Sequence, residues 1–324
     1  MTYHRPIMVK EIIEILQPRS KGVHVDGTVG GGGHALAVAE KMDEDGLLIA
    51  IDRDGEALQH ARGVLADVRP RVEFVRGDWR NVHRHLEELG VGLIDSALLD
   101  LGVSSHQLDT PRRGFSYADR DAPLDMRMDM DSPLSASDVV NDYSEGDLTR
   151  IIAIYGEERW ASRIAKFIVC KRPMYTVGEL VDTIKAAIPA SARRDGPHPA
   201  RRTFQALRME VNRELEAFEE GLMDFVESLT AGGRMAVITF HSLEDRPVKR
   251  LFRYLSRECR CPPQLPVCAC GGPVVHDLTR HPVTPSDGEV LENPRSRSAK
   301  LRAIELIRDA SEVLRERRES SRWQ

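Results

Sequence analysis

The stretch V-H-V-D-G-T-V-G-G-G-G-H, from Val23 to His34, decides the fold of this 324-residue chain. A β-branched segment runs into four consecutive glycines, and the alanine-rich segment 35–40 follows, which predicts a strand, a tight loop and a helix. A second apolar run, 47–51, ends on Asp52. A carboxylate at such a strand tip is placed to accept the hydrogens of a ribose diol. The pattern therefore predicts a site for a nucleoside cofactor.

The same alternation continues beyond the glycine loop. Helical patterns such as 56–65 lie between short apolar segments at 23–26, 47–52, 72–75 and 94–100. Repeated strand and helix units of this kind predict an α/β fold with a doubly wound, mostly parallel sheet. The next convincing strand is 234–240, far beyond Asp100, although a crossover between parallel strands needs only about a dozen residues. The gap therefore predicts an insertion.

Part of that gap is one long crossover helix, because apolar residues repeat at spacings of three and four over 204–229. Helical patterns at 148–154 and 160–169 predict a small helical domain in the remainder, at the carboxyl edge of the sheet. The segment 298–307 is expected to form a final antiparallel edge strand. The predicted organisation is 1–109 and 204–309 for the two parts of the sheet domain, 110–203 for the insert, and 310–324 for a charged, flexible tail.

Composition limits the class of protein. Hydrophobic residues make up 41% and charged residues 30% of the chain, and no apolar run approaches the roughly 20 residues that cross a bilayer. The amino-terminal residues lack the pattern of a secretory signal. We therefore expect a soluble, cytoplasmic protein with no membrane partner.

The net charge of −5 argues against a general nucleic-acid coat protein, which needs an excess of Lys and Arg. Basic residues nevertheless gather in two segments, where they form either solvated helix faces or RNA-binding surfaces. The two groups are Arg193, Arg194, Arg201, Arg202, Arg208 and Arg213, and Arg246, Lys249, Arg250, Arg253, Arg257 and Arg260.

The glycine loop alone admits either a dinucleotide or S-adenosylmethionine, because Ala35 satisfies the last position of the dinucleotide pattern. The preceding Asp26 favours the second cofactor. A carboxylate there repels a pyrophosphate, whereas it attracts the amino and sulfonium groups of a methionine moiety. The residues thus favour a methyl donor over a dinucleotide.

Two later strand ends fit the same cofactor. Asp78 and Trp79 follow the third strand, where they are suited to bracket an adenine; the alternative for Trp79 is a core aromatic. The fourth strand ends on Asp100, beside the reactive end of a cofactor bound at this edge. A carboxylate there is suited to orient an amine nucleophile or to take its proton, although a loop acid or helix cap has the same sequence position.

Four of the five cysteines lie in C-R-C-P-P-Q-L-P-V-C-A-C, from Cys259 to Cys270. This clustering and the odd number make a secreted disulfide framework the weaker interpretation. Two close pairs are compatible with a tetrahedral zinc site through Cys259, Cys261, Cys268 and Cys270, although C-x-x-C is the commoner spacing. Cys170 is expected to be a small buried residue in a helix.

Taken together, the motifs resemble the ribosomal RNA small subunit methyltransferase H family nearly from end to end. The longest runs, L-L-D-L-G-V-S-S-H-Q-L-D and F-H-S-L-E-D-R, are far more specific than a glycine loop. The matching segments are 4–8, 26–28, 32–34, 50–54, 98–109, 113–117, 123–128, 155–159, 198–200, 202–206, 240–246 and 293–298.

The resemblance implies a class I S-adenosylmethionine-dependent methyltransferase, with a Rossmann-like sheet and an inserted helical domain for substrate recognition. It implies methylation of N4 of a decoding-centre cytosine in 16S rRNA, with free rRNA or the assembled small ribosomal subunit as partner. A homodimer is a further expectation. Family chemistry requires no metal, so none is predicted. The cofactor contacts carried over by position are Gly32, Gly33, His34, Asp52, Trp79, Asp100 and Gln107; Trp79 stands where phenylalanine is common.

The cytosine amine is a poor nucleophile, because its lone pair is delocalised into the ring. We expect Asp100, or a nearby backbone carbonyl, to accept the amine hydrogen, and His241 either to line the pocket or to be structural. The arginines of 193–202 and 246–253 are expected to grip flanking phosphates. Two alternatives stay open at this point: a small-molecule methyltransferase, and a ribosome-associated binding protein that retains the cofactor.

Overall fold

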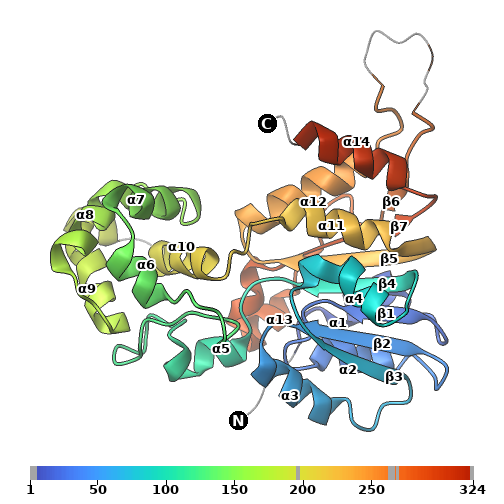
Figure 1. Cartoon of the computed structure of the whole chain (residues 1–324), viewed down its shortest axis with the longest axis horizontal. Helices are drawn as coiled ribbons and strands as arrows, with labels where there is room; N and C mark the ends of the chain where they lie inside the picture. Colours follow the sequence, from blue (N-terminus) through green and yellow to red (C-terminus); the bar gives the residue numbers. More distant parts are fainter. Residues whose placement is uncertain (1–5, 195–197, 262–266, 268–269, 322–324) are drawn as a thin grey trace. The chain divides into compact units, whose positions relative to one another are not determined.

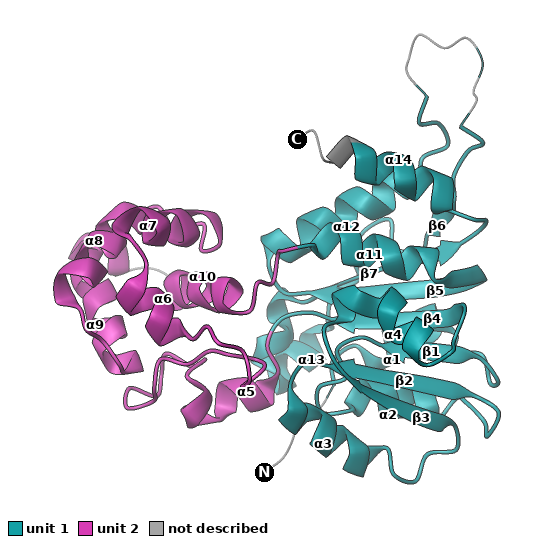
Figure 2. Ribbon diagram, viewed as in Figure 1, with its two compact units in different colours: residues 1–102, 217–324 teal, residues 103–216 magenta. Residues whose placement is uncertain are grey.

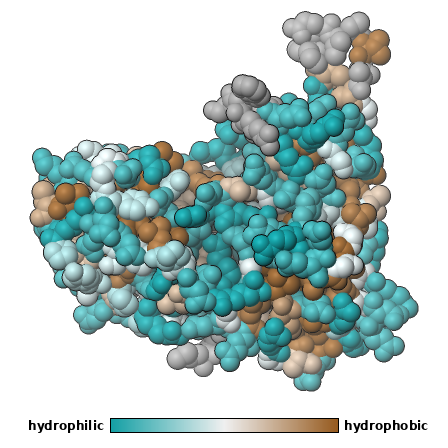
Figure 3. Space-filling model, viewed as in Figure 1, coloured by the Kyte–Doolittle hydropathy of each residue, from teal (hydrophilic) through white to brown (hydrophobic). Residues whose placement is uncertain are grey.

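The structure is a computed structural model of the chain and describes residues 6–194, 198–261, 267 and 270–321. The first two residues of the matching segment 4–8, His4 and Arg5, and the cysteine Cys268 lie outside the described residues. Within the described part, no helix combines the length and the apolar character needed to cross a membrane. The face seen in Figure 3 is largely hydrophilic.

The chain divides into two compact units (Figure 2). Residues 1–102 and 217–324 form the sheet unit, and residues 103–216 form the helical unit. The helical unit is thus wider at both ends than the predicted insert, 110–203.

The sheet unit contains a seven-stranded sheet in the order β3-β2-β1-β4-β5-β7-β6 (Figure 1). The first five strands in sequence pair in parallel, whereas β7 is antiparallel to β5 and to β6. The predicted mostly parallel, doubly wound sheet is therefore confirmed. The strands are β1 (Val23–Asp26), β2 (Leu47–Asp52), β3 (Arg71–Arg76), β4 (Ile94–Asp100), β5 (Leu229–Thr239), β6 (Val275–Asp277) and β7 (Lys300–Leu306).

Helices cover both faces of this sheet. On one face, Ile12 and Leu16 of α1 pack against Leu98 of β4, and Ala35 of α2 packs with Leu48 of β2. The central strands are buried on both faces, which explains their continuous apolar sequences. The helices of the sheet unit are α1 (Val9–Leu16), α2 (Gly33–Ala39), α3 (Gly55–Val64), η1 (Trp79–Asn81), α4 (Val82–Glu88), α11 (Phe218–Glu227), α12 (Ser242–Leu255), α13 (Asp287–Glu292), η4 (Pro294–Ser298) and α14 (Ser311–Ser321).

Two predictions for the carboxyl-terminal region were wrong. The expected edge strand, β7, is an interior strand, because the short β6 pairs along its other side. The expected flexible tail contains helix α14, in which Leu314 is fully buried. Arg318 anchors this helix by donating hydrogen bonds to Asp224 (2.7 Å) and Glu227 (2.8 Å) of α11. These long-range ion pairs cannot be read from the composition of the tail.

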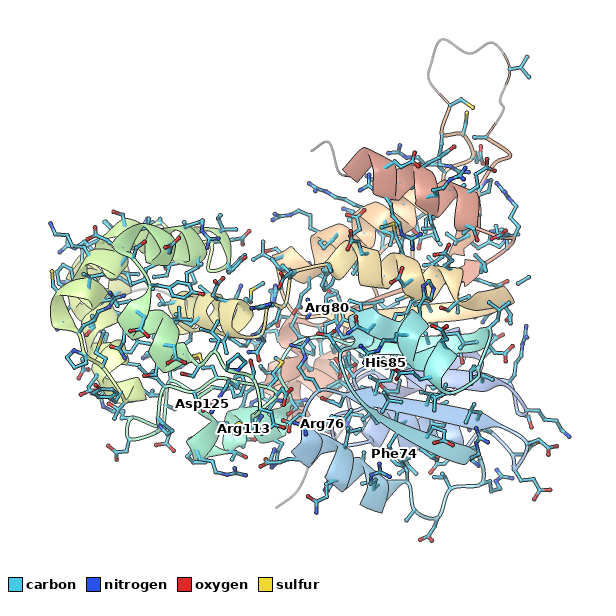
Figure 4. The ribbon with its side chains drawn as sticks, viewed as in Figure 1. Phe74, Arg76, Arg80, His85, Arg113 and Asp125 are labelled. Carbon is cyan, nitrogen blue, oxygen red and sulfur yellow. The ribbon has the colours of Figure 1, made fainter. Side chains whose placement is uncertain are left out.

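The helical unit has its own apolar core, built from all its longer helices. Arg113 is fully buried there and donates hydrogen bonds to the carbonyls of Arg127 (3.0 Å) and Met128 (2.9 Å); Figure 4 labels it with Asp125. Cys170 is exposed, so its predicted burial was wrong. The helices are α5 (Ser105–Asp109), η2 (Pro111–Arg113), α6 (Ala136–Asp142), α7 (Glu145–Ile154), α8 (Ala161–Lys171), α9 (Val177–Ala187), η3 (Ala190–Arg193) and α10 (Arg201–Val211).

The predicted single crossover helix over 204–229 is two helices. α10 ends at Val211 and α11 begins at Phe218, although the apolar repeat continues between them. The side chain of Asn212 accepts the N–H of Met128 (2.7 Å) and donates to the carbonyl of Met126 (2.8 Å). This asparagine therefore ends the helix through hydrogen bonds to a distant segment, which periodicity cannot predict.

Candidate active site

Three aspartates stand at the carboxyl ends of three neighbouring parallel strands. Asp26, Asp52 and Asp100 are the last residues of β1, β2 and β4. The strand order reverses between β1 and β4, and ligands of open α/β sheets bind at such a switch point, outside the carboxyl ends of the strands. The sequence placed all three acids at this edge, and the structure brings them together there.

The glycine loop after β1 lets the backbone approach this edge. Gly30 and Gly32 have positive φ angles of 50° and 81°, which a residue with a Cβ adopts only with strain. Gly32 precedes α2, and Gly33 is its first residue. A Cβ on Gly33 would lie 2.9 Å from the ring of Pro6. The predicted residues Gly32 and Gly33 are thus required by the course of the backbone.

Asp52 holds the glycine loop in place. One carboxylate oxygen accepts the N–H of Gly30 (2.8 Å), and the other accepts the N–H of Asp54 (2.9 Å). Burial raises the pKa of Asp52 to about 6, against the opposing effect of these two hydrogen bonds. Each oxygen keeps a second lone pair, so the carboxylate retains the capacity to accept both hydrogens of a diol.

The folded protein disfavours the charged forms of Asp26 and Asp100. Burial raises the pKa of Asp26 to about 7, and the neighbouring charges of Asp100 and Asp52 add to this. Burial, followed by the charge of Glu244, raises the pKa of Asp100 to about 7 as well. Oδ1 of Asp100 is buried and has no hydrogen-bond partner among the described residues. A nearby cation or N–H donor would stabilise both carboxylates in their charged forms.

His34 contributes an acceptor to this group. Its Nε2 lies 2.8 Å from the carbonyl of Ile7, so this nitrogen carries the hydrogen. Burial lowers the pKa of His34, although the Ile7 carbonyl opposes this effect. The imidazole is therefore neutral near pH 7, with a bare Nδ1 that lies 3.7 Å from Oδ2 of Asp100. That Nδ1 is available to accept an N–H from a ligand.

Two residues that the sequence analysis gave no role support this edge. The hydroxyl of Thr28 accepts the N–H of Asp100 (2.6 Å). Glu244 is buried and lies 2.9 Å from Nε2 of His241, while its second oxygen accepts the N–H of Phe240 (2.9 Å). The pattern H-x-x-E at the start of a helix places both side chains on one face, so the sequence did contain a signal for this pair.

Asp78 and Trp79 occupy a well-packed loop after β3. Arg53 donates to Asp78 (2.9 Å), and Arg80, labelled with His85 in Figure 4, donates to it through Nε (2.8 Å). Burial alone would raise the pKa of Asp78, but these arginines hold it below its usual value. Trp79 is 6% exposed and packs edge-on against Phe218, with ring centroids 5.5 Å apart. The packing role of Trp79 is therefore evident, whereas stacking on an adenine stays a prediction.

Gln107 belongs to the helical unit. Its side-chain oxygen accepts the N–H of Ser104 (3.1 Å), and the Ser104 hydroxyl accepts the N–H of Gln107 (3.2 Å), which completes a capping box on α5. Its predicted contact with a cofactor therefore stays a prediction.

The edge as a whole suits a ligand with positive charge and a diol. Asp26, Asp100 and the Nδ1 of His34 are acceptors without a cationic side chain bonded to them among the described residues. S-adenosylmethionine carries an ammonium, a sulfonium and a ribose, so its chemistry fits these groups. A dinucleotide would bring a pyrophosphate to the same acids, which is unfavourable.

The predicted basic segments are exposed in both units. On α12, the exposed residues Arg246, Lys249, Arg250 and Arg253 recur at the spacing of one helix face. In the helical unit, Arg193, Arg194, Arg201 and Arg202 are exposed, and residues 195–197 lie outside the described part. Arg208 is not available in the same way, because it forms an ion pair with Glu214 (2.8 Å).

Comparison with known proteins agrees with this chemistry. A family model described as the MraW methylase family matches residues 1–307. The ribosomal RNA small subunit methyltransferase H of Heliobacterium modesticaldum is 53% identical over 311 residues, covering 94% of this chain and 99% of the relative. Proteins of the same name from Symbiobacterium thermophilum (52% over 315 residues, 96% and 99% covered) and Geobacter sulfurreducens (54% over 312 residues, 95% and 100% covered) are equally similar.

Proposed function

Because this chain belongs to the MraW methylase family, we propose that it methylates N4 of a cytosine in 16S rRNA, with S-adenosylmethionine as the methyl donor. Relatives that align over nearly their whole length are named as small subunit rRNA methyltransferases. The chemical part of the proposal rests on one observation: the buried Oδ1 of Asp100 has no hydrogen-bond partner among the described residues.

The residues of the edge contact different parts of the cofactor. Asp52 accepts the hydrogens of the ribose diol, and the positive-φ glycines let the backbone approach the cofactor closely. Asp26 and Nδ1 of His34 face the ammonium and sulfonium end. Trp79 and Gln107 are further proposed contacts. When bound, S-adenosylmethionine supplies an electrophilic methyl group.

Asp100 orients the attacking amine and accepts its hydrogen. The lone pair of the cytosine amine is delocalised, so an acceptor that fixes the N–H directions turns the lone pair toward the methyl group. Burial raises the pKa of Asp100, which makes its carboxylate a better proton acceptor than an exposed one. His241, held by Glu244 at 2.9 Å, lines the same edge as a positioning residue.

The RNA must present an unstacked base, as for other enzymes that act on bases. We assign the phosphate contacts to the exposed basic residues of 246–253 on α12 and of 193–202 in the helical unit, and substrate recognition to the insert, 110–203. The proposal places the enzyme in the cytoplasm, as a homodimer that acts on free rRNA or on the small subunit.

A transfer assay tests the proposal. The purified protein is incubated with methyl-labelled cofactor and either free 16S rRNA or small ribosomal subunits, and the RNA is digested to nucleosides. We expect N4-methylcytidine in at least one of the two. Asp100→Asn should lower its formation by about 100-fold or more. Asp45→Asn is the matched control, because Asp45 is an exposed acid that pairs with Lys21 on the surface.

The outcomes separate the alternatives. Label in small molecules but not in RNA would favour a small-molecule methyltransferase. Cofactor binding without transfer to any RNA would favour a ribosome-associated binding protein. A fully active Asp100→Asn enzyme would contradict the proposed role of Asp100. It would not contradict the proposal that RNA is the substrate.

A further inference from the structure

Three cysteine side chains converge where the chain passes from α12 to β6. The sulfur atoms of Cys259, Cys261 and Cys270 all lie within 4.8 Å of one another. In a tetrahedral site with Zn–S bonds of about 2.3 Å, neighbouring sulfurs are about 3.8 Å apart. The three thiols are therefore close to the spacing of a metal-thiolate site, although they come from both ends of the segment.

Hydrogen bonds from Arg260 link the two ends of the segment, and one of them goes to the sulfur of Cys270. The backbone N–H of Arg260 donates to Sγ of Cys270 (3.2 Å), and the guanidinium of Arg260 donates to the carbonyls of Cys270 (3.1 Å) and Gly272 (2.8 Å). An N–H donor and a nearby guanidinium both favour a negatively charged sulfur. The residue between the first two cysteines thus fixes the position of the third.

The base of the segment is anchored on the sheet unit. Arg308, which follows β7, donates to the carbonyls of Gly271 (3.0 Å) and Gly272 (2.9 Å). The N–H of Val274 donates to the carbonyl of Leu255 at the end of α12 (3.0 Å). In Figure 1 the segment leaves α12 and returns to β6. Hydrogen bonds therefore hold both ends of the segment that carries the cysteines to the sheet unit.

We propose that Cys259, Cys261 and Cys270 bind a structural zinc ion that ties the end of α12 to β6. An all-sulfur donor set selects a soft or borderline metal, and zinc is the usual choice for a structural thiolate site. Three thiolates and Zn²⁺ carry one net negative charge, which the nearby guanidinium of Arg260 balances. The sequence supplies a fourth cysteine, Cys268, which lies outside the described residues; the proposal rests on the other three.

Metal analysis tests the site independently of methyl transfer. The full chain is purified under reducing conditions, dialysed against metal-free buffer, and measured by elemental mass spectrometry. We expect about one zinc ion per chain. The double variant Cys259→Ser/Cys261→Ser and the single variant Cys270→Ser should each lose most of this zinc. Cys170→Ser, which removes an exposed cysteine of the helical unit, should retain it.

Two further measurements address the geometry and the role. Replacement of zinc by cobalt should give a sulfur-to-cobalt charge-transfer band, which the double variant lacks. Chelation should speed hydrogen exchange at the N–H of Val274 in the wild type. It should have no such effect in the double variant, where exchange is already fast.

Several results would overturn the proposal. Reduced wild-type protein that holds no zinc, or serine variants that lose none, would contradict the site. A disulfide among these cysteines in freshly prepared protein also contradicts it, as does iron in place of zinc. Unchanged exchange at Val274 after zinc removal would refute the structural role.

Discussion

The sheet unit buries carboxylates in two different ways. At the edge formed by β1, β2 and β4, burial and the charges of neighbouring carboxylates raise the pKa values of Asp26 and Asp100 to about 7. Beside β7, burial acts on Asp245 in the same direction, but hydrogen bonds from Arg302 (2.6 and 3.3 Å) outweigh it and lower the pKa. The difference is the presence of a cationic side chain beside the carboxylate. Asp245 has such a partner within the chain, whereas the acids of the edge would gain one from a cationic ligand.

The largest expected effect is at Asp100. Asp100→Asn should lower methyl transfer by about 100-fold or more, because the amide cannot take the proton. The same change should stabilise the fold at pH 7.5 by about 1–3 kcal/mol, since a raised carboxyl pKa destabilises the folded state above the unfolded value. Activity assays and chemical denaturation measure the two effects. A variant that is both inactive and less stable would mean that Asp100 is structural.

The opposite sign is expected at Asp245. Asp245→Asn leaves the buried guanidinium of Arg302 without its charge partner and should lower stability by about 3 kcal/mol at pH 7.5. The pKa of Asp245 is depressed, so the loss is present above the unfolded pKa and fades as the pH falls through the folded one. Denaturation of wild type and variant at pH 7.5 and 3 measures this. Equal stability at pH 7.5 would remove the contrast between the two regions.

Cofactor affinity should depend on pH near neutrality. Protonation of an edge carboxyl with a pKa of about 7 removes the negative charge that a cationic ligand needs, so affinity should fall about eightfold from pH 7.5 to pH 6 for one such group. Binding should also release protons in this range. Calorimetry in buffers of different ionisation enthalpy measures both. The double variant Asp26→Asn/Asp100→Asn should keep only the weaker dependence that comes from Asp52, whose pKa is about 6. A wild-type profile as shallow as that of the double variant would contradict the assignment.

An effect of similar, modest size is expected on the outer face of α12, the helix that carries Asp245 on its inner side. Replacing Lys249, Arg250 and Arg253 by Gln should weaken RNA binding by about tenfold. The loss of two to three phosphate contacts should also make the slope of log K against log salt concentration shallower, by roughly 0.7–0.9 for each contact. Cofactor affinity should not change. Filter binding across a salt series and cofactor titration measure the two. Equal losses in RNA and cofactor binding would indicate damage to the fold instead.

Much of the site could be predicted from sequence because it depends on strand ends. Apolar runs located β1, β2 and β4, and the residues that end them, Asp26, Asp52 and Asp100, were identified correctly as strand-tip acids. Parallel strands bring such residues to one edge whatever the helices do. Glu244 received no role, although its spacing from His241 was a usable signal.

Predictions failed where distant partners decide the structure. The apolar repeat over 204–229 continues past Asn212, yet the helix ends there, where that side chain donates to the carbonyl of Met126 and accepts the N–H of Met128. The tail looked too charged to fold, but Arg318 finds Asp224 and Glu227 on α11. Local propensity carries no information about either contact.

The sequence by itself determined the parallel sheet, the glycine loop and the acids at the strand ends, because hydrophobic periodicity and backbone sterics act locally. Only the tertiary structure decided which carboxylates have a cationic side chain beside them. Asp78 and Asp245 have arginines brought to them from elsewhere in the chain, whereas Asp100 keeps a buried oxygen without a partner among the described residues. Charge balance depends on neighbours in space, and the chain specifies these only by folding.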